Sequence, residues 1–233
     1  MSHFQFQTVS NIISGLGSIY ELKQLLQQQP YKKLLLVTDA GMIQQQLHLP
    51  IIEILETIQL DYVIYSSVQA DPPEHIVLDA VQFAKNEKVD IVLGFGGGSS
   101  LDVAKVIAIL VHPQQQQTLS DLYGINNVKQ PRLPLFLVPT TAGTGSEVTP
   151  ISIVTTGKTT KTGIVSPILF ADVAILDATF TQNLPAHITA ATGIDAMVHA
   201  IEAYTSKIKK NPYADMLAKQ ALKLLNHNLS LVL

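Results

Sequence analysis

Cysteine and tryptophan are both absent from the 233 residues, and arginine occurs once, as Arg132. Without cysteine the chain has no disulfide framework, no thiolate nucleophile and no cysteine-ligated zinc, which fits a reducing cytoplasm. Charged residues make up only 14% of the chain and the net charge is −3. This balance gives no basic field for nucleic acid or for an anionic membrane, so we expect neither as a partner.

Long hydrophobic runs are also missing. The longest apolar helical run, residues 103–111, is broken by Lys105 and is too short to span a bilayer. The first residues lack the basic and then apolar pattern of a signal peptide. Hydrophobic residues nevertheless make up 47% of the chain, enough for a sizeable core. We therefore expect a cytoplasmic protein that is not membrane-bound.

Short apolar runs alternate with helical patterns over most of the chain. The runs at residues 33–38, 62–65, 90–94, 133–138 and 173–176 are typical of buried strands, and residues 41–57, 74–88 and 99–111 are typical of helices. Continuous apolar strands joined by crossover helices predict an α/β fold with a parallel sheet covered on both faces. The alternation in residues 4–7 suggests an added edge strand, and residues 151–155 and 161–165 suggest a hairpin.

The pattern changes after Pro185. Two helices are predicted, at residues 186–206 and 213–232, and Asn211-Pro212 marks the break between them. We therefore divide the chain into an α/β domain over residues 1–183 and the first helices of an all-α domain over residues 184–233. Because the chain stops in apolar sequence at residues 231–233, we interpret the helical domain as truncated.

A glycine-rich turn at residues 94–100, GFGGGSS, follows a predicted strand and opens a helix. Glycines let a ligand approach the backbone closely, and free amides at a helix N-terminus attract phosphate. This indicates pyrophosphate binding, although Leu101 stands where the dinucleotide fingerprint has its last glycine. The alternative is a tight turn with Ser99 as helix N-cap and Asp102 completing a capping box.

Two further strand ends carry polar groups. Asp39 ends a strand, where a carboxylate can accept hydrogen bonds from ribose and repel a 2′-phosphate, or can cap the next helix. Residues 139–149, PTTAGTGSEVT, offer hydroxyls that can line a cofactor site or satisfy their own turn. Gly157-Lys158-Thr159 is not a P-loop, because Ser152 occupies the position of the required glycine.

Asp195 and His199 form a candidate metal site. Their spacing of four residues stacks a carboxylate and an imidazole on one face of a helix, with Glu202 on the same face. The alternatives are a salt bridge within the helix or a hydrogen-bonded core histidine. His227 lies near the end of the last predicted helix, where it fits a surface position better than a ligand.

Taken together, GGGSSLD, PTTAGTGSEVT, ATGIDAMVHAIEAY and NPYADMLAKQALKLL resemble the iron-containing (group III) alcohol dehydrogenase family, in family order along essentially the whole chain. The resemblance implies a dehydroquinate synthase-like architecture with the active site between an α/β domain and an all-helical domain. It also implies an NAD-linked enzyme and, when full length, a homo-oligomer. Its Fe²⁺, with Zn²⁺, Co²⁺ or Mn²⁺ as alternatives, would act as a Lewis acid on a small alcohol or aldehyde.

The resemblance also implies roles for individual residues. Asp195 and His199 become the first two metal ligands. The cofactor-binding positions become Asp39, Asp71, Gly97, Gly98, Ser99, Ser100, Asp102, Thr140, Thr141, Thr149, Lys161 and Thr181. Two departures are visible: the family usually has asparagine where Asp71 stands, and its third and fourth ligands, both histidines, fall in segments that this chain does not contain.

Three functions therefore compete. The leading one is a metal-dependent NAD-linked alcohol dehydrogenase, impaired in these 233 residues because two of four ligands are missing. A dehydroquinate-synthase-like lyase would need clustered basic residues for its phosphorylated substrate, and the chain has a single arginine. The third is a non-catalytic NAD-binding fragment.

Overall fold

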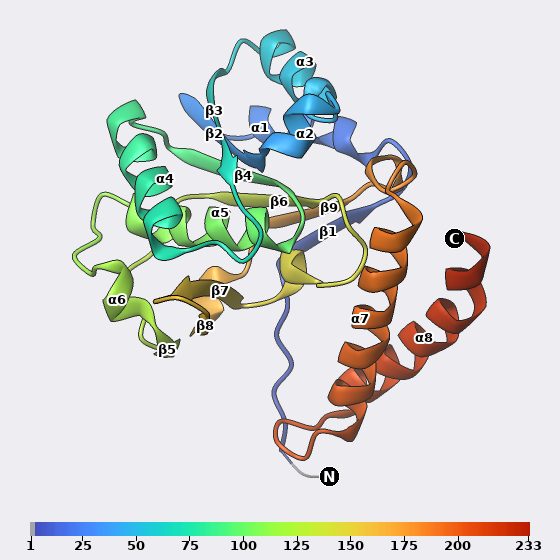
Figure 1. The fold of residues 1–233 in the computed structure, drawn as a ribbon. Coiled ribbons are helices and arrows are strands. Elements are labelled where there is room, and N and C mark those ends of the chain that lie inside the picture. Colours follow the sequence, from blue (N-terminus) through green and yellow to red (C-terminus); the bar gives the residue numbers. More distant parts are fainter. Residues whose placement is uncertain (1–2) are drawn as a thin grey trace.

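A parallel sheet with helices on both faces accounts for most of the chain, and a pair of long helices follows it (Figure 1). The computed structural model of the protein describes residues 3–233. The six strands lie in the order β1 (Asn11–Ser14), β9 (Val173–Leu176), β6 (Leu135–Pro139), β4 (Ile91–Gly96), β2 (Lys33–Asp39) and β3 (Asp61–Val68). Every neighbouring pair is parallel. The predicted α/β class is confirmed.

Both faces of the sheet are buried, which explains why its strands are continuous apolar runs. In β2, Leu35 and Val37 belong to one core cluster, while Leu34 and Leu36 belong to the other. All four side chains are fully buried. Successive side chains point to opposite faces of a strand, so a strand between two helical layers needs an apolar residue at every position.

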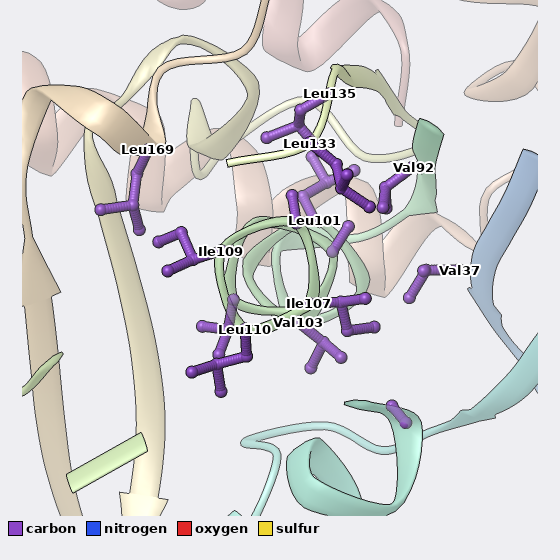
Figure 2. Packing of buried hydrophobic residues seen from close by; sticks show 14 of the residues in the cluster. Val37, Val92, Leu101, Val103, Ile107, Ile109, Leu110, Leu133, Leu135 and Leu169 are labelled. Carbon is purple, nitrogen blue, oxygen red and sulfur yellow. The ribbon is translucent and has the colours of Figure 1, made fainter. Parts of the chain in front are cut away.

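The helices form the two outer layers. The first layer contains α4 (Glu74–Glu87) and α5 (Gly98–Leu110), and the second contains α1 (Leu22–Gln27), α2 (Ala40–Gln44) and α3 (Leu49–Thr57). Figure 2 shows apolar side chains of α5, among them Leu101, Val103 and Ile107, together with those of neighbouring strands, such as Val92 and Leu135. Because α5 is buried along almost its whole length, its N-terminus is held rigidly against the sheet.

A small second sheet lies beside α5. The predicted hairpin is confirmed as β7 (Ile151–Thr156) and β8 (Thr160–Val165), which pair antiparallel and are extended by β5 (Gly124–Ile125). The remaining short elements are α6 (Leu119–Leu122) and the 3-10 turns η1 (Ser18–Glu21), η2 (Ser146–Val148), η3 (Pro167–Leu169), η4 (Ala178–Phe180) and η5 (Leu229–Leu231).

The last helices are α7 (Ala186–Thr205) and α8 (Pro212–Asn228), which pack against each other (Figure 1). Asn211 caps α8, because its Oδ1 accepts from the backbone N–H of Ala214 at 2.9 Å. Gly193 in α7 allows the turn that follows α8 to approach closely, since a Cβ at this position would collide with the Leu229 side chain. No helix within residues 3–233 is long and apolar enough to cross a membrane.

Two local predictions were wrong, and one helix was missed. Residues 4–7 form no strand; β1 is the edge strand, and Phe4 and Phe6 instead stack on Tyr213 with ring centroids 5.9 and 5.6 Å apart. Residues 41–57 form two helices, because Gln46 takes a positive φ of 58° and Pro50 lies in the first turn of the second helix. Helix α1 was not predicted, since its six residues are too few to show a helical period.

Candidate functional site

The sheet changes direction between β2 and β4. β3 lies on one side of β2. The chain then crosses back, so that β4 lies on the other side of β2 and β6 lies next to β4. In open α/β sheets this switch point is where ligands bind, outside the carboxyl ends of the strands. Asp39 ends β2, and the glycine turn follows β4.

The glycine turn leaves the N-terminus of α5 without a side-chain cap. Gly97 is the N-cap residue, and no side chain accepts from the first amides of the helix. The alternative of Ser99 as N-cap with Asp102 in a capping box is therefore wrong. Gly97 has room in front of it, because the nearest protein atom to a Cβ here would be Thr141 Cγ2 at 3.7 Å. Open amides beside a side-chain-free residue fit a pyrophosphate group.

Asp39 caps the helix that follows it. Its Oδ1 accepts from the backbone N–H groups of Gly41 and Met42 at 2.9 and 3.2 Å. Its Oδ2 faces the glycine turn, since it would lie 3.2 Å from a Cβ at Gly96. The capping interpretation of Asp39 is thus confirmed, and the second carboxylate oxygen stands at the switch point where a ribose would bind.

The hydroxyl-rich loop after β6 lies against the glycine turn. The backbone N–H of Thr140 donates to Gly96 O at 2.9 Å and so ties the ends of β6 and β4 together. Thr140 Oγ1 is buried and has no hydrogen-bond partner among residues 3–233. A buried hydroxyl normally has a partner, so this atom fits a site that is completed by a bound molecule.

Lys105 lies beside the cleft, and the sequence reasoning missed it. It is fully buried, and its Nζ lies 2.6 Å from Ile151 O, 2.8 Å from Ser146 Oγ and 3.2 Å from Asp102 Oδ1. Burial lowers the pKa of the ammonium group, and Asp102 opposes this change. The signal was present, because a lysine within the apolar run at residues 103–111 needs a partner when that run is buried.

Asp102 connects the turn to the hairpin instead of capping α5. Its Oδ1 accepts from Ser146 Oγ at 2.6 Å, and its Oδ2 accepts from the backbone N–H of Ile153 at 2.8 Å. Nearby, burial raises the pKa of Glu147. The Asp102–Lys105 pair thereby fixes η2 and β7 against the first turn of α5, which is the wall that a nucleotide would contact.

Asp195 and His199 lie on one face of α7. Asp195 Oδ2 and His199 Nδ1 are 3.7 Å apart, which is too long for a hydrogen bond. Two ligands bound to one ion at about 2.1 Å stand roughly 3 to 3.5 Å apart, so the observed separation is slightly too long, and a small side-chain movement would bring the pair to two positions of a divalent cation site. The His199 side chain is 52% exposed and is therefore not a core histidine. Within residues 3–233, no third histidine, aspartate or glutamate joins the pair.

One cleft of about 680 Å³ brings the nucleotide turn and the metal pair together. Gly98 and Ser99 lie on one wall, and Asp195 and His199 lie on another. The other lining residues are Asp71, Pro72, Asp102, Thr144, Ser146, Thr149, Ile151, Ile153 and Lys161. Residues nearly 100 positions apart in the sequence thus face a single space, which suits a ligand that extends from the turn to α7.

Asp71 and Lys161 form an ion pair on the cleft wall, with Lys161 Nζ 2.6 Å from Asp71 Oδ1. Asp71 has a φ of 50°, a conformation that aspartate and asparagine tolerate better than most residues. Its carbonyl oxygen accepts from Thr155 Oγ1 at 2.9 Å, so the loop before α4 is fastened to β7. Among residues 3–233, Lys161 is the only lysine or arginine that lines the cleft, and it is paired with Asp71.

Six of the predicted site residues do not line this cleft: Asp39, Gly97, Ser100, Thr140, Thr141 and Thr181. Ser100 is 1% exposed and packs beneath Gly96. Thr181 lies just after η4, and its Oγ1 donates to Ala178 O at 3.0 Å. Thr144 and Ser146, in contrast, line the cleft although neither was singled out. A hydroxyl-rich sequence does not reveal which of its hydroxyls face a ligand.

The fold and this cleft define a doubly wound α/β unit joined to a helical pair that carries a carboxylate and an imidazole on the cleft. Residues 10–178 match the family described as iron-containing alcohol dehydrogenase, and residues 189–233 match the C-terminal part of the Fe-containing alcohol dehydrogenase family. The chain belongs to the iron-containing alcohol dehydrogenase family.

Individual relatives agree with this membership. The chain is 37% identical to sulfoacetaldehyde reductase of Bilophila wadsworthia (strain 3_1_6), covering 97% of this chain and 58% of that protein. It is 36% identical to an NAD-dependent methanol dehydrogenase of Bacillus methanolicus, covering 93% and 56%. A solved 1,3-propanediol oxidoreductase superposes with a TM-score of 0.93 at 33% identity, covering 99% of this chain and 60% of that one. The chain thus spans somewhat over half the length of these relatives.

Proposed function

We propose that this chain supplies the nucleotide-binding unit and two metal ligands of a metal-dependent, NAD-linked alcohol dehydrogenase, which interconverts an alcohol with an aldehyde or ketone. The observation that supports this most strongly is the shared cleft, in which Gly98 and Ser99 face Asp195 and His199. The reaction needs a nicotinamide and a polarised alcohol oxygen side by side, and this cleft has groups suited to each.

NAD is the proposed cofactor. The open amides at the start of α5 would hold the pyrophosphate, and Gly97 would let it approach the backbone. Asp39 would accept from the adenosine ribose through Oδ2 and repel a 2′-phosphate, which favours NAD over NADP. One solved relative, a sulfoacetaldehyde reductase from Bifidobacterium kashiwanohense that superposes with a TM-score of 0.91 at 29% identity, is described in complex with NAD+.

Asp195 and His199 are the proposed ligands of a divalent metal. Their oxygen and nitrogen donors suit Fe²⁺, and Zn²⁺, Co²⁺ and Mn²⁺ also accept this combination. When bound, the metal supplies Lewis-acid polarisation of the alcohol oxygen. The two side chains would hold it on the face of α7 that borders the cleft, opposite the turn that holds the nucleotide.

We propose that these 233 residues alone bind NAD weakly and have little or no dehydrogenase activity. Two ligands hold a divalent ion far less tightly than four. The helical pair also leaves large apolar side chains exposed, among them Ile194, Ile201 and Leu217. Such a surface fits one that further helices of the same domain would cover, consistent with our proposed division after residue 183.

The substrate class is proposed only as a small alcohol or aldehyde. The relatives are described as acting on compounds as different as sulfoacetaldehyde and methanol. A lyase that holds a phosphorylated substrate is disfavoured, because Arg132 is engaged with Asp172 at 2.7 Å and Lys161 is paired with Asp71. We further propose that a full-length form assembles as a homo-oligomer.

The test separates the two halves of the site. Calorimetric titration of the chain with Co²⁺ should show binding that is lost in Asp195→Asn and in His199→Ala, while NADH affinity stays within about twofold in both variants. Glu202→Gln, on the same helix, is the matched control and should bind Co²⁺ like the parent. Unchanged Co²⁺ binding in the first two variants, or steady turnover by the 233 residues on addition of Fe²⁺, would contradict the proposal.

A further inference from the structure

The loop after β6 contacts the backbone of α7. A Cβ at Gly143 would lie 2.5 Å from Thr192 O and 2.7 Å from Thr192 Cβ. Real Cβ atoms do not come so close, and both of these atoms are fixed by the helix backbone. Any larger residue at position 143 therefore forces the loop and α7 apart, because no flexible side-chain end is available to move aside.

The next residue of the same loop contacts the nucleotide turn. A Cβ at Gly98 would lie 3.0 Å from Thr144 Cγ2 and 3.1 Å from Thr144 Oγ1. Thr144 is held in place, since its Oγ1 accepts from the backbone N–H of Ser146 at 3.2 Å. Two consecutive residues thus connect the first residue of α5 to the middle of α7.

The contacted face of α7 is the face that carries the metal ligands. Thr192, Asp195 and His199 follow one another at steps of three and four residues, so they share one side of the helix. With a rise of about 1.5 Å per residue, Asp195 stands about 4.5 Å and His199 about 10.5 Å along the axis from Thr192. A displacement of the helix at Thr192 therefore carries both ligands with it.

We propose that Gly143 is a positioning residue: its missing side chain sets how closely the Asp195–His199 pair approaches a nucleotide bound at the α5 turn. This inference rests on the proposed function, because it concerns the relation between the two halves of that site. Gly143 itself touches neither ligand. It acts through Thr192 on one side and through its neighbour Thr144 on the other.

The experiment is an NMR titration of the 233-residue chain with NADH, comparing Gly143→Ala with the parent. The amides of Gly98 and Ser99 report that the nucleotide binds at the α5 turn. The imidazole of His199 reports how closely the bound nucleotide approaches α7. In the parent we expect both sets of resonances to shift together. In Gly143→Ala the amide shifts should persist with a dissociation constant within about threefold of the parent, while the His199 shift falls by about half or more.

Gly163→Ala is the matched control, because a Cβ there would meet only Ile153 Cδ1 at an ordinary 3.5 Å. It should behave like the parent in both readouts. An unchanged His199 shift in Gly143→Ala would overturn the inference. If the Gly98 and Ser99 amide shifts fall to the same extent as the His199 shift, the inference is also overturned. Such a result would mean that the substitution weakens nucleotide binding as a whole.

Two further outcomes are distinguishable. If NADH shifts neither the Gly98 nor the Ser99 amide in the parent, the proposed nucleotide site fails, and with it the basis of the inference. If Gly143→Ala does not fold, Thr144→Ser tests the other end of the same connection by removing the methyl group that packs on Gly98. That variant should lose part of the His199 shift, and a full parental response would overturn the inference.

Discussion

The α/β unit and the α7–α8 pair differ sharply in how completely they bury their apolar side chains. The α/β unit fills both faces of its sheet, with residues such as Leu35 and Leu93 fully buried. Among residues 3–233, the only buried apolar side chains on the two long helices belong to Ala200 and Ala218. Most of their large apolar side chains are exposed: Ile188, Ile194, Val198, Ile201, Tyr204, Tyr213, Met216, Leu217 and Leu224.

This difference divides the candidate site. Gly98 and Ser99, on the nucleotide side of the cleft, belong to the unit that has its own core. Asp195 and His199, on the metal side, belong to helices that bury little apolar surface besides their contact with each other. We therefore expect nucleotide binding to follow the stability of the α/β unit. Metal binding should depend on what covers α7 and α8. The following predictions test this division, beginning with the largest effect.

Truncating a buried leucine should lower the free energy of unfolding several-fold more than truncating an exposed leucine. Leu101 is fully buried in α5, so Leu101→Ala should lower the free energy of unfolding by about 2 to 5 kcal/mol. Leu217 is 52% exposed on α8, so Leu217→Ala should change it by about 0.5 kcal/mol or less. Urea denaturation followed by circular dichroism measures both. Equal losses would mean that the helical pair is as tightly packed as the α/β unit.

Gly97→Ala should remove nucleotide binding without harming the fold. The added Cβ meets protein only at Thr141, at 3.7 Å, but it occupies the space where a pyrophosphate would approach. We expect NADH affinity to fall about tenfold or more, equivalent to about 1.4 kcal/mol, with an unchanged thermal midpoint. Fluorescence titration and thermal unfolding measure the two quantities. Parental NADH affinity would place the nucleotide elsewhere.

Asp177 should make the α/β unit sensitive to acid. Burial would raise the pKa of this carboxyl, but hydrogen bonds from Gly17, Ile19 and Thr179 outweigh it and lower the pKa below 3.8. A lowered folded-state pKa stabilises the protein above the unfolded value, and this contribution is lost as the pH falls through the folded-state value.

Asp177→Asn should therefore reduce stability at pH 7 and flatten its decline below about pH 4. Urea unfolding at a series of pH values measures this slope. Asp61→Asn, at an exposed position in the same unit, is the control and should keep the parental slope. An Asp177→Asn curve parallel to the parental curve would show that the carboxylate does not contribute.

Asp71→Asn should have the smallest effect. The Asp71–Lys161 pair is more than half exposed, so its loss should cost about 0.2 to 1 kcal/mol of stability. Freed from Asp71, the Lys161 ammonium group can attract the nucleotide phosphates, so NADH affinity should rise modestly and become more salt-dependent. Titrations at low and high salt measure this change. Weaker NADH binding at low salt would mean that the carboxylate itself assists the cofactor.

The sequence predicted the fold well because the buried strands and the long helices have strong periods. The apolar run of β2 and the helix start at Asn211 can each be recognised from a few consecutive residues. Contacts between distant segments were not predictable in this way. The burial of Lys105 by Ser146 and Ile151, and the approach of Gly143 to Thr192, depend on how loops meet across the fold. Sequence reasoning could identify the motifs but not which of their side chains would face the cleft.

The most direct test of the account is a crystal structure of this chain soaked with NAD. We expect the pyrophosphate at Gly97, Gly98 and Ser99, with the nicotinamide end extending toward Asp195 and His199 within the same cleft. A nucleotide bound away from the α5 turn, or one directed away from α7, would contradict it.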